Sequence, residues 1–261
     1  MSGHDLPFEL PAVGLGTWQM WGQAAERGVR DAIELGYRLI DTAAAYHNEE
    51  AVGAGIRSSG IDPGELLVVT KFPEEDAGRE REVLRTSLDL LGVEHIDLWL
   101  VHAPLDAAGS LRIWERFLEA REEGLVRAIG VSNFLPEQVD DLVKASGVVP
   151  AVNQIAFGPH YYDADVAPYH AAHGIALQAH SPFSENNLAH PVLRAIADRH
   201  GCNVRQVLLR WHRAHGISAV VKSVSRTHLT ENLDAASHPL DPAEVAALDR
   251  LGINPTPGQR A

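Results

Sequence analysis

Disulfides, membrane spans and a signal peptide are all missing from this chain of 261 residues. Its one cysteine, Cys202, excludes an intramolecular disulfide and fits a reducing compartment. No uninterrupted apolar stretch approaches the roughly 20 residues needed to cross a bilayer. Residues 1–10 have no apolar core flanked by basic residues, as a signal peptide would. We therefore expect a cytoplasmic protein with no membrane partner.

Basic residues are also scarce. The chain has 22 Lys and Arg against 35 Asp and Glu, a formal net charge of −13. A nucleic-acid partner is not expected, because binding it would need a face of the protein rich in Lys and Arg to neutralise phosphates.

Low-complexity runs are absent, and 45% of the residues are hydrophobic, enough to bury a core. The chain should be globular.

What the chain does contain is an alternation of two patterns. Short aliphatic and β-branched runs predict buried strands at residues 13–17, 39–42, 66–72, 96–102, 128–132, 151–155, 175–180 and 218–222. The segments between them have apolar residues at spacings of three and four, which predicts amphipathic helices. No long Pro/Gly/Ser-rich linker interrupts this order. We predict an α/β fold, a single (β/α)8 TIM barrel, with one domain over residues 1–261.

A doubly wound open sheet is the competing architecture, and strand counting does not exclude it. Its glycine-rich dinucleotide fingerprint is not found here. Gly14 and Gly16 have the first spacing of that motif, but Gln19 occupies the place of the third glycine. The barrel is therefore favoured.

Polar residues stand where five successive strands are predicted to end. They are Asp41, Lys71, His102, Ser132 with Asn133, and Gln154. In a parallel barrel these ends converge on the face that carries active sites. Such a set is hard to explain as helix caps alone, so we expect a functional site there.

A tyrosine near these residues could transfer protons. Free tyrosine has a pKa of about 10, and we expect the Lys71 ammonium to lower the pKa of Tyr46 while Asp41 keeps the lysine charged. Neutral His102 could donate a hydrogen bond to a carbonyl oxygen. Farther along, Lys222, Ser223 and Ser225 precede a predicted helix start, which is a plausible phosphate site.

Four motifs resemble those of the aldo-keto reductase family. They are residues 36–49 (GYRLIDTAAAYHNE), residues 91–98 (LGVEHIDL) followed by Val101 and His102, residues 130–134 (GVSNF) and residues 222–224 (KSV). They are long and stand in family order, and the resemblance as a whole covers about residues 14–232. The resemblance implies an NADPH-dependent reductase of small carbonyl compounds, such as keto sugars or keto acids, that requires no metal. A monomer is the family expectation, with NADH as a second cofactor.

The resemblance also implies residue roles. The catalytic residues would be Asp41, Tyr46, Lys71 and His102, with Tyr46 as proton donor. The substrate would contact Trp18, Tyr46, Phe72 and His102. The cofactor would be held by Gly16, Thr17, Trp18, Asp41, Ser132, Asn133, Gln154, His180, Ser181, Pro182, Phe183, Lys222, Ser223, Val224, Ser225, His228, Glu231 and Asn232.

The sequence departs from the family pattern at the cofactor and at the pocket wall. His180 replaces the tyrosine on which the nicotinamide stacks, and His228 replaces the arginine that grips the phosphate of NADPH, so its preference over NADH should be weakened. Pro73 and Ala103 stand where aromatic residues are common. With short loops and a chain that ends soon after Leu251, we expect an open pocket for small or polar substrates.

Two other functions were weighed. The same barrel could bind the cofactor as a regulatory or sensor protein with little turnover, against which the intact tetrad counts. A metal-dependent hydrolase would need histidines and carboxylates converging at strand ends, where only His102 clearly stands. The pairs His170 with His173 and His212 with His215 have helical spacing but no suitable partner ligands, so no metal is expected.

Overall fold

The computed structural model describes residues 6–184 and 186–252. Eight parallel strands form a closed barrel in chain order, and β8 pairs with β1. They are β1 (Val13–Gly16), β2 (Leu39–Asp41), β3 (Leu67–Phe72), β4 (Ile96–Val101), β5 (Val126–Ser132), β6 (Val152–Ala156), β7 (Ala176–His180) and β8 (Ser218–Val221). The (β/α)8 prediction is confirmed, since the pairing of β8 with β1 leaves no open sheet.

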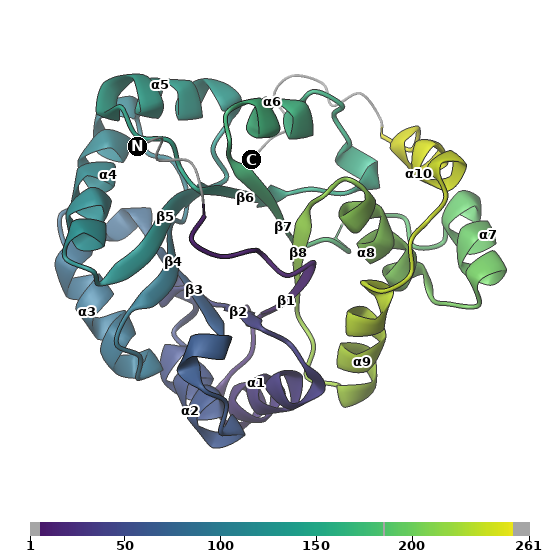
Figure 1. Ribbon diagram of the computed structural model, residues 1–261, viewed down its shortest axis with the longest axis horizontal. Helices are drawn as coiled ribbons and strands as arrows, with labels where there is room; N and C mark the ends of the chain where they lie inside the picture. Colours follow the sequence, from purple (N-terminus) through teal and green to yellow (C-terminus); the bar gives the residue numbers. More distant parts are fainter. Residues whose placement is uncertain (1–5, 185, 253–261) are drawn as a thin grey trace.

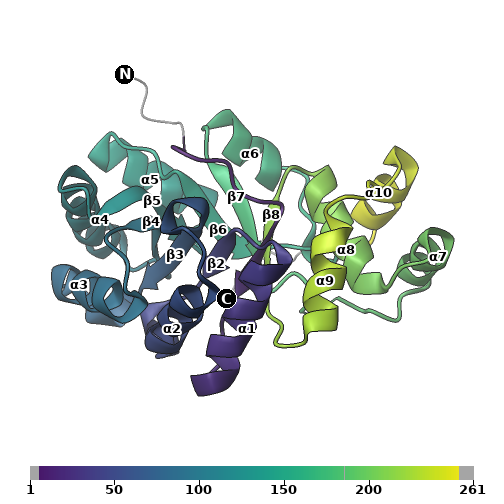
Figure 2. The same ribbon diagram turned by 60° about the horizontal axis from the view of Figure 1, so that its bottom comes forward.

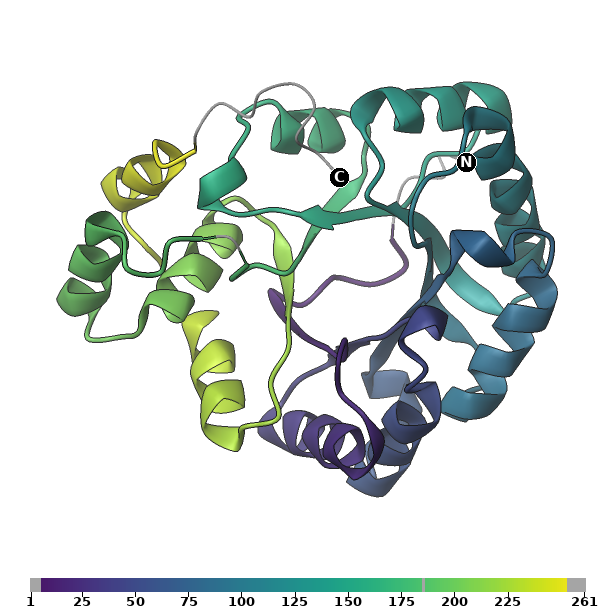
Figure 3. The same ribbon diagram turned by 180° about the vertical axis from the view of Figure 1, so that it is seen from behind.

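Helices surround the barrel on all sides, as Figure 1 shows and Figure 3 shows from behind. They are α1 (Gly22–Leu35), α2 (Glu49–Ser59), α3 (Glu80–Leu91), α4 (Ala107–Glu122), α5 (Pro136–Ser146), α6 (Val166–Ala172), α7 (Pro191–His200), α8 (Val204–Ala214), α9 (Arg226–Ala235) and α10 (Pro242–Asp249). The strand β7 is followed by two helices, and α10 packs against both of them.

Strand alternation divides the apolar residues into two cores. On β4, Trp99 and Val101 face the helices and join the large cluster between the two layers, whereas Leu98 and Leu100 face the barrel interior. The interior cluster is covered at one end by residues 6–12, whose trace runs across the barrel before β1 (Figures 1 and 2). This end of the barrel is covered, so access to the barrel interior remains at the opposite end, where the strands reach their carboxyl ends.

Within residues 6–184 and 186–252, no helix is long and apolar enough to cross a membrane. The expectations about the start of the chain and about its course after Leu251 fall largely on residues 1–5 and 253–261. Those residues lie outside the described part of the chain.

Candidate active site

A cavity of about 530 Å³ opens at the carboxyl ends of the strands. Its volume is in the range of small-molecule sites. It is lined by Gly16, Trp18, Gln19, Asp41, Ala45, Tyr46, Lys71, His102, Ser132, Asn133, Gln154, His180, Ser181, Pro182, Phe183, Ser184, Val220, Val221 and Lys222. The four residues assigned to catalysis from the sequence thus meet in one cavity.

A buried ion pair forms the floor of this cavity. Lys71 on β3 donates from Nζ to Asp41 Oδ1 at 2.6 Å and to the Thr42 carbonyl at 3.1 Å. Both side chains are almost fully buried. Burial by itself would lower the pKa of Lys71, but the negative charge of Asp41, together with interactions with Asp41 and Tyr46, outweighs it and raises that pKa. The ammonium therefore stays charged at neutral pH.

Tyr46 ends a 3-10 helix, η1 (Ala44–Tyr46), which follows β2 and turns the phenol over the ion pair. Lys71 Nζ lies 5.3 Å from the centroid of the Tyr46 ring, and the His102 ring lies edge-on to it at 5.7 Å. Burial raises the pKa of Tyr46, and the opposing effect of Lys71 does not cancel it. The expected lowering of this pKa is therefore wrong: desolvation dominates, and the phenol is protonated at neutral pH.

Two neutral histidines stand beside the phenol. Burial, followed by the nearby charge of Lys71, lowers the pKa of His102 to about 4 and that of His180 to about 4. At neutral pH each ring therefore has one N–H donor and one acceptor nitrogen. A neutral imidazole at His102 agrees with the role expected from the sequence, in which the ring donates a hydrogen bond to the substrate but does not transfer its proton.

The orientation of His180 follows from Asn133. The Asn133 amide nitrogen donates to the His102 carbonyl and to Ser132 Oγ, both at 3.1 Å. Its Oδ1 must therefore accept, and His180 Nε2 is the donor at 2.9 Å. His180 Nδ1 is then the acceptor that faces Ser181 Oγ at 3.2 Å. The imidazole ring at the end of β7 is thereby tied to the loop that follows β5, across the intervening β6.

Unusual backbone conformations gather at the same loops. Of the non-glycine residues in the described ranges, four have positive φ: Gln19, His47, Asn133 and Ser181, with φ between 51° and 63°. Three line the cavity, and His47 follows Tyr46 directly. Residues other than glycine rarely adopt this left-handed backbone conformation, and those that do cluster at functional sites.

Two residues predicted to contact the cofactor or substrate near the catalytic group do not line the cavity. Phe72 has none of its side chain exposed and packs on Trp99 and Phe117, because it follows the inward-facing Lys71 on β3 and so points to the helices. Thr17 is also fully buried, and its hydroxyl donates to the Asp41 carbonyl at 3.0 Å. Neither side chain faces the cavity in this structure.

The predicted phosphate site lies beyond Lys222, at the start of α9. Ser225 caps this helix, with Oγ accepting from the His228 N–H at 3.4 Å, and Ser223 hydrogen-bonds within the same turn. Val224 is exposed. Farther along α9, Glu231 accepts from the Asn203 amide, and buried Asn232 hydrogen-bonds to Tyr37.

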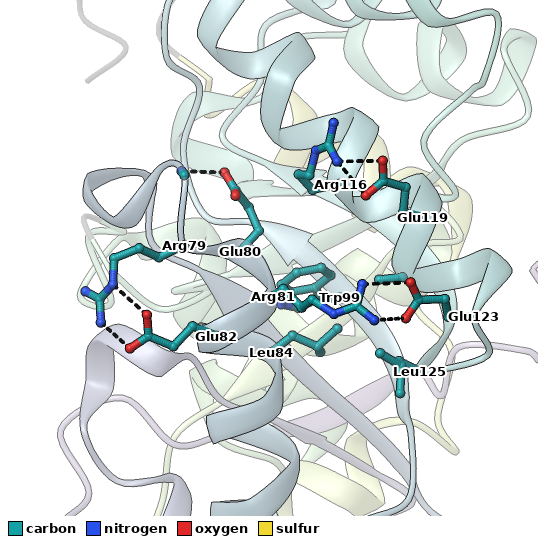
Figure 4. Close-up of a pocket in the computed structure, with 12 residues that line it drawn as sticks. Arg79, Glu80, Arg81, Glu82, Leu84, Trp99, Arg116, Glu119, Glu123 and Leu125 are labelled. Atoms are coloured by element: carbon teal, nitrogen blue, oxygen red, sulfur yellow. Dashed lines mark hydrogen bonds and ion pairs between the residues drawn. The ribbon is translucent and has the colours of Figure 1, made fainter.

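A second cavity, of about 330 Å³, lies outside the barrel between α3 and α4 (Figure 4). Its arginines are all paired with carboxylates: Arg79 with Glu82, Arg81 with Glu123 and Arg116 with Glu119. It holds none of the residues assigned from the sequence. In the described part of the chain, no group of three or more His, Cys, Asp and Glu residues is placed to hold a metal ion.

Comparison of the sequence with known proteins identifies the family of this chain. Residues 12–253 match the model of the Aldo/keto reductase family. The chain belongs to this family. It is 41% identical over 246 residues to an aldo-keto reductase of Mycolicibacterium vanbaalenii, with 93% of this chain and 88% of that protein covered. It is 36% identical to methylglyoxal reductase DkgA of Escherichia coli strain K12, with 94% and 93% covered.

A solved structure supports the same membership. The aldo-keto reductase of Bombyx mori, determined in complex with NADP, superposes with a TM-score of 0.88 at 33% identity, with 93% of this chain and 89% of that chain covered. The family resemblance seen in the four motifs of this aldo-keto reductase is thus confirmed.

Several residues of the site escaped the sequence prediction. Gln19, Ala45 and Ser184 line the cavity but stand in loops or, for Ala45, in the single turn of η1, where no periodic pattern indicates direction. Gln178 contacts Gln154 from the middle of β7. A signal for Gln178 did exist, because a glutamine in an otherwise apolar barrel strand needs buried hydrogen-bond partners.

Proposed function

We propose that this aldo-keto reductase uses NAD(P)H to reduce small aldehydes and ketones to alcohols, with Tyr46 as the proton donor. The observation that carries the proposal is the buried Lys71–Asp41 pair directly beneath a protonated phenol in an open cavity. The name of the relative from Escherichia coli, a methylglyoxal reductase, supports a small carbonyl substrate.

The donors and acceptors of the cavity fit a nicotinamide carboxamide. Gln154 lines the cavity, and its amide nitrogen is taken by Asp41 and Gln178. Among the described residues none donates to Gln154 Oε1, so this oxygen can accept from the carboxamide nitrogen. Ser132 and Asn133 would support the same group, and Lys222 with the start of α9 would take the phosphates. When bound, the reduced cofactor supplies the hydride.

The chain's own residues supply the proton. His102 would donate its imidazole N–H to the carbonyl oxygen and orient it beside Tyr46. As negative charge develops on that oxygen, the Tyr46 hydroxyl gives up its proton to it. The phenolate that remains is stabilised by the Lys71 ammonium, which Asp41 keeps in place. The alcohol forms without a change in the charge of Lys71.

The test is oxidation of NADPH and of NADH in the presence of small aldehydes, ketones, keto acids and keto sugars. We expect turnover of several of these compounds. Binding of cofactor without turnover across the whole panel would instead favour the sensor function. The metal-dependent hydrolase has no supporting observation in the geometry of the cavity.

His180 is proposed to pack on the nicotinamide ring. Its ring stands at the cavity edge and is oriented by Asn133, and its pKa of about 4 keeps it uncharged at neutral pH. We expect His180→Ala to weaken NADPH binding by about 3- to 30-fold, through loss of one aromatic contact. Fluorescence titration measures this, and an unchanged dissociation constant would contradict the stacking.

The residues at the expected phosphate site, at the start of α9, support a weakened preference for NADPH over NADH. His228 is exposed, and Arg226 Nη1 is engaged by Asp31 at 3.3 Å and Glu34 at 3.0 Å on α1. The nearest arginine is therefore shared with two carboxylates. We propose that NADPH is still preferred but that NADH is accepted. A kcat/KM for NADPH more than about a thousandfold that for NADH, equivalent to about 4 kcal/mol, would contradict this proposal.

His228→Arg is expected to raise the ratio of kcat/KM for NADPH to that for NADH by about 10- to 100-fold. A charged hydrogen bond to phosphate contributes about 1.5–3 kcal/mol, and arginine is permanently charged. The matched control is Arg226→Ala, which should shift the ratio by less than about threefold, because exposed ion pairs contribute little. An equal effect of both variants would refute the assignment to position 228.

We also propose that the activity resides in one domain over residues 1–261 of a cytoplasmic monomer. The unbroken alternation of elements and the single cysteine support this. Sedimentation analysis of the purified chain would show a mass near 28.3 kDa, and a stable dimer would contradict the proposal.

A further inference from the structure

A row of hydrogen-bonded side chains crosses the barrel interior and ends on the catalytic ion pair. Ser218 Oγ donates to the Pro11 carbonyl at 2.7 Å, and Gln178 Nε2 donates to Ser218 Oγ at 3.2 Å. Gln154 Nε2 donates both to Gln178 Oε1 and to Asp41 Oδ2, each at 2.7 Å. The row thus connects the closed end of the barrel with the carboxylate that holds Lys71.

The register of the sheet places these side chains together. Gln154 on β6 is level with Gln178 on β7, which is level with Ser218 on β8. Residues at the same level of neighbouring strands face the same side of a sheet. All three are buried, and Gln178 has no exposed surface at all. The middle of the row therefore has no access to solvent that could replace a missing partner.

The direction of every hydrogen bond in the row is determined by its two ends. The Pro11 carbonyl and the ionised Asp41 carboxylate can only accept hydrogen bonds. Gln178 must therefore present nitrogen to Ser218 and oxygen to Gln154, whose nitrogen then serves both Gln178 and Asp41. A rotated Gln154 amide would set its oxygen against two acceptors, leaving buried groups unsatisfied.

We propose that Gln178 is a positioning residue for cofactor recognition. By accepting from Gln154 Nε2, Gln178 holds the Gln154 amide so that Oε1 faces the cavity as an acceptor. That oxygen distinguishes a carboxamide, which donates N–H, from a group of the same shape that cannot. The inference rests on the proposed function, in which Gln154 contacts the nicotinamide carboxamide.

The experiment compares binding of NADP⁺ with that of its 3-acetylpyridine analogue, in which a methyl ketone replaces the carboxamide. Calorimetry on the purified full chain measures both dissociation constants. The native protein should bind NADP⁺ about tenfold more tightly, the effect of one hydrogen bond. In Gln178→Leu the Gln154 amide nitrogen keeps Asp41 but loses one of its two acceptors, so its orientation is no longer fixed from both sides and the two dissociation constants should agree within about twofold.

Two further variants separate positioning from general stability. Gln178→Glu, measured at mildly acidic pH, introduces a buried carboxylic acid that still accepts from Gln154 and donates to Ser218, so it should restore most of the discrimination. Gln206→Leu removes another buried glutamine, on α8, that hydrogen-bonds to Glu231. This control should lower the unfolding temperature and leave the discrimination as in the native protein.

The outcomes are distinguishable. If the native protein binds both cofactors equally, Gln154 does not recognise the carboxamide, and the site assignment fails together with the inference. If the native protein discriminates and Gln178→Leu discriminates equally well, the inference alone is overturned. An equal loss of affinity for both cofactors in Gln178→Leu would also overturn it, because a purely structural role predicts that result.

Discussion

Tyr46→Phe is expected to lower kcat for carbonyl reduction by about 100- to 10,000-fold, the usual contribution of a positioned proton donor. The phenylalanine ring keeps the contacts with His102 and with the Lys71 ammonium but has no proton to give. The dissociation constant of NADPH should change by less than about threefold, since the cofactor contacts proposed above do not include the phenol. Steady-state kinetics and fluorescence titration measure the two quantities.

The chain offers a matched control for this substitution. Tyr169 on α6 also has a hydrogen-bonded hydroxyl, which lies 2.6 Å from Asp140 Oδ1 and 2.9 Å from the Pro136 carbonyl oxygen, away from the cavity, so that its one proton is shared between two acceptors. Tyr169→Phe removes the same atom and should leave kcat within about twofold of the native value. If Tyr46→Phe retained more than about a tenth of the native kcat, Tyr46 would not be the proton donor.

Asp41→Asn is expected to lower the unfolding free energy at neutral pH by about 3–5 kcal/mol, because it leaves the buried Lys71 ammonium without its counterion. The loss should shrink as the pH rises toward about 10.4, the pKa of an exposed lysine, because above it the unfolded state no longer gains from protonation. Denaturant unfolding at several pH values measures the effect. A loss below about 1 kcal/mol at pH 7 contradicts it.

A double variant tests whether the unpaired charge of Lys71 is the cause of this loss of stability. Lys71→Met combined with Asp41→Leu removes both charges and fills much of the space with apolar atoms. Replacement of a buried ion pair in this way is often neutral or stabilising, so the double variant should be more stable than Asp41→Asn alone. Both variants should have little activity. The double variant should thus regain stability without regaining activity. This result would show that Asp41→Asn is destabilised by the unpaired charge of Lys71 and not by a general loss of packing.

The catalytic assignments could be made from the sequence because of where the residues stand along their strands. Asp41 and Lys71 come at the ends of apolar runs, and parallel strands bring such ends to one face. The side-chain direction next to them was harder to infer. The family resemblance implied that Phe72 contacts the substrate, yet strand alternation sends the side chains of Lys71 and Phe72 to opposite faces.

Electrostatic outcomes were the least accessible from sequence. The pKa of Tyr46 depends on how completely the phenol is desolvated, and burial proves to outweigh the nearby ammonium. Arg226 is only two positions from His228 in the sequence, but α1 brings Asp31 and Glu34 beside its guanidinium. Both results depend on groups that are distant along the chain.

Local pattern was thus sufficient to predict the barrel, the family and which polar residues gather at the carboxyl ends of the strands, including Tyr46 with Asp41 and Lys71. Apolar periodicity specifies which elements form, and motif order specifies which strand end carries each group. Tertiary structure settled which side chains meet: the row from Ser218 through Gln178 and Gln154 to Asp41 depends on the register of separate strands. Hydrogen bonding across strands leaves no periodic trace in the sequence, because each partner is a single polar residue within an apolar run.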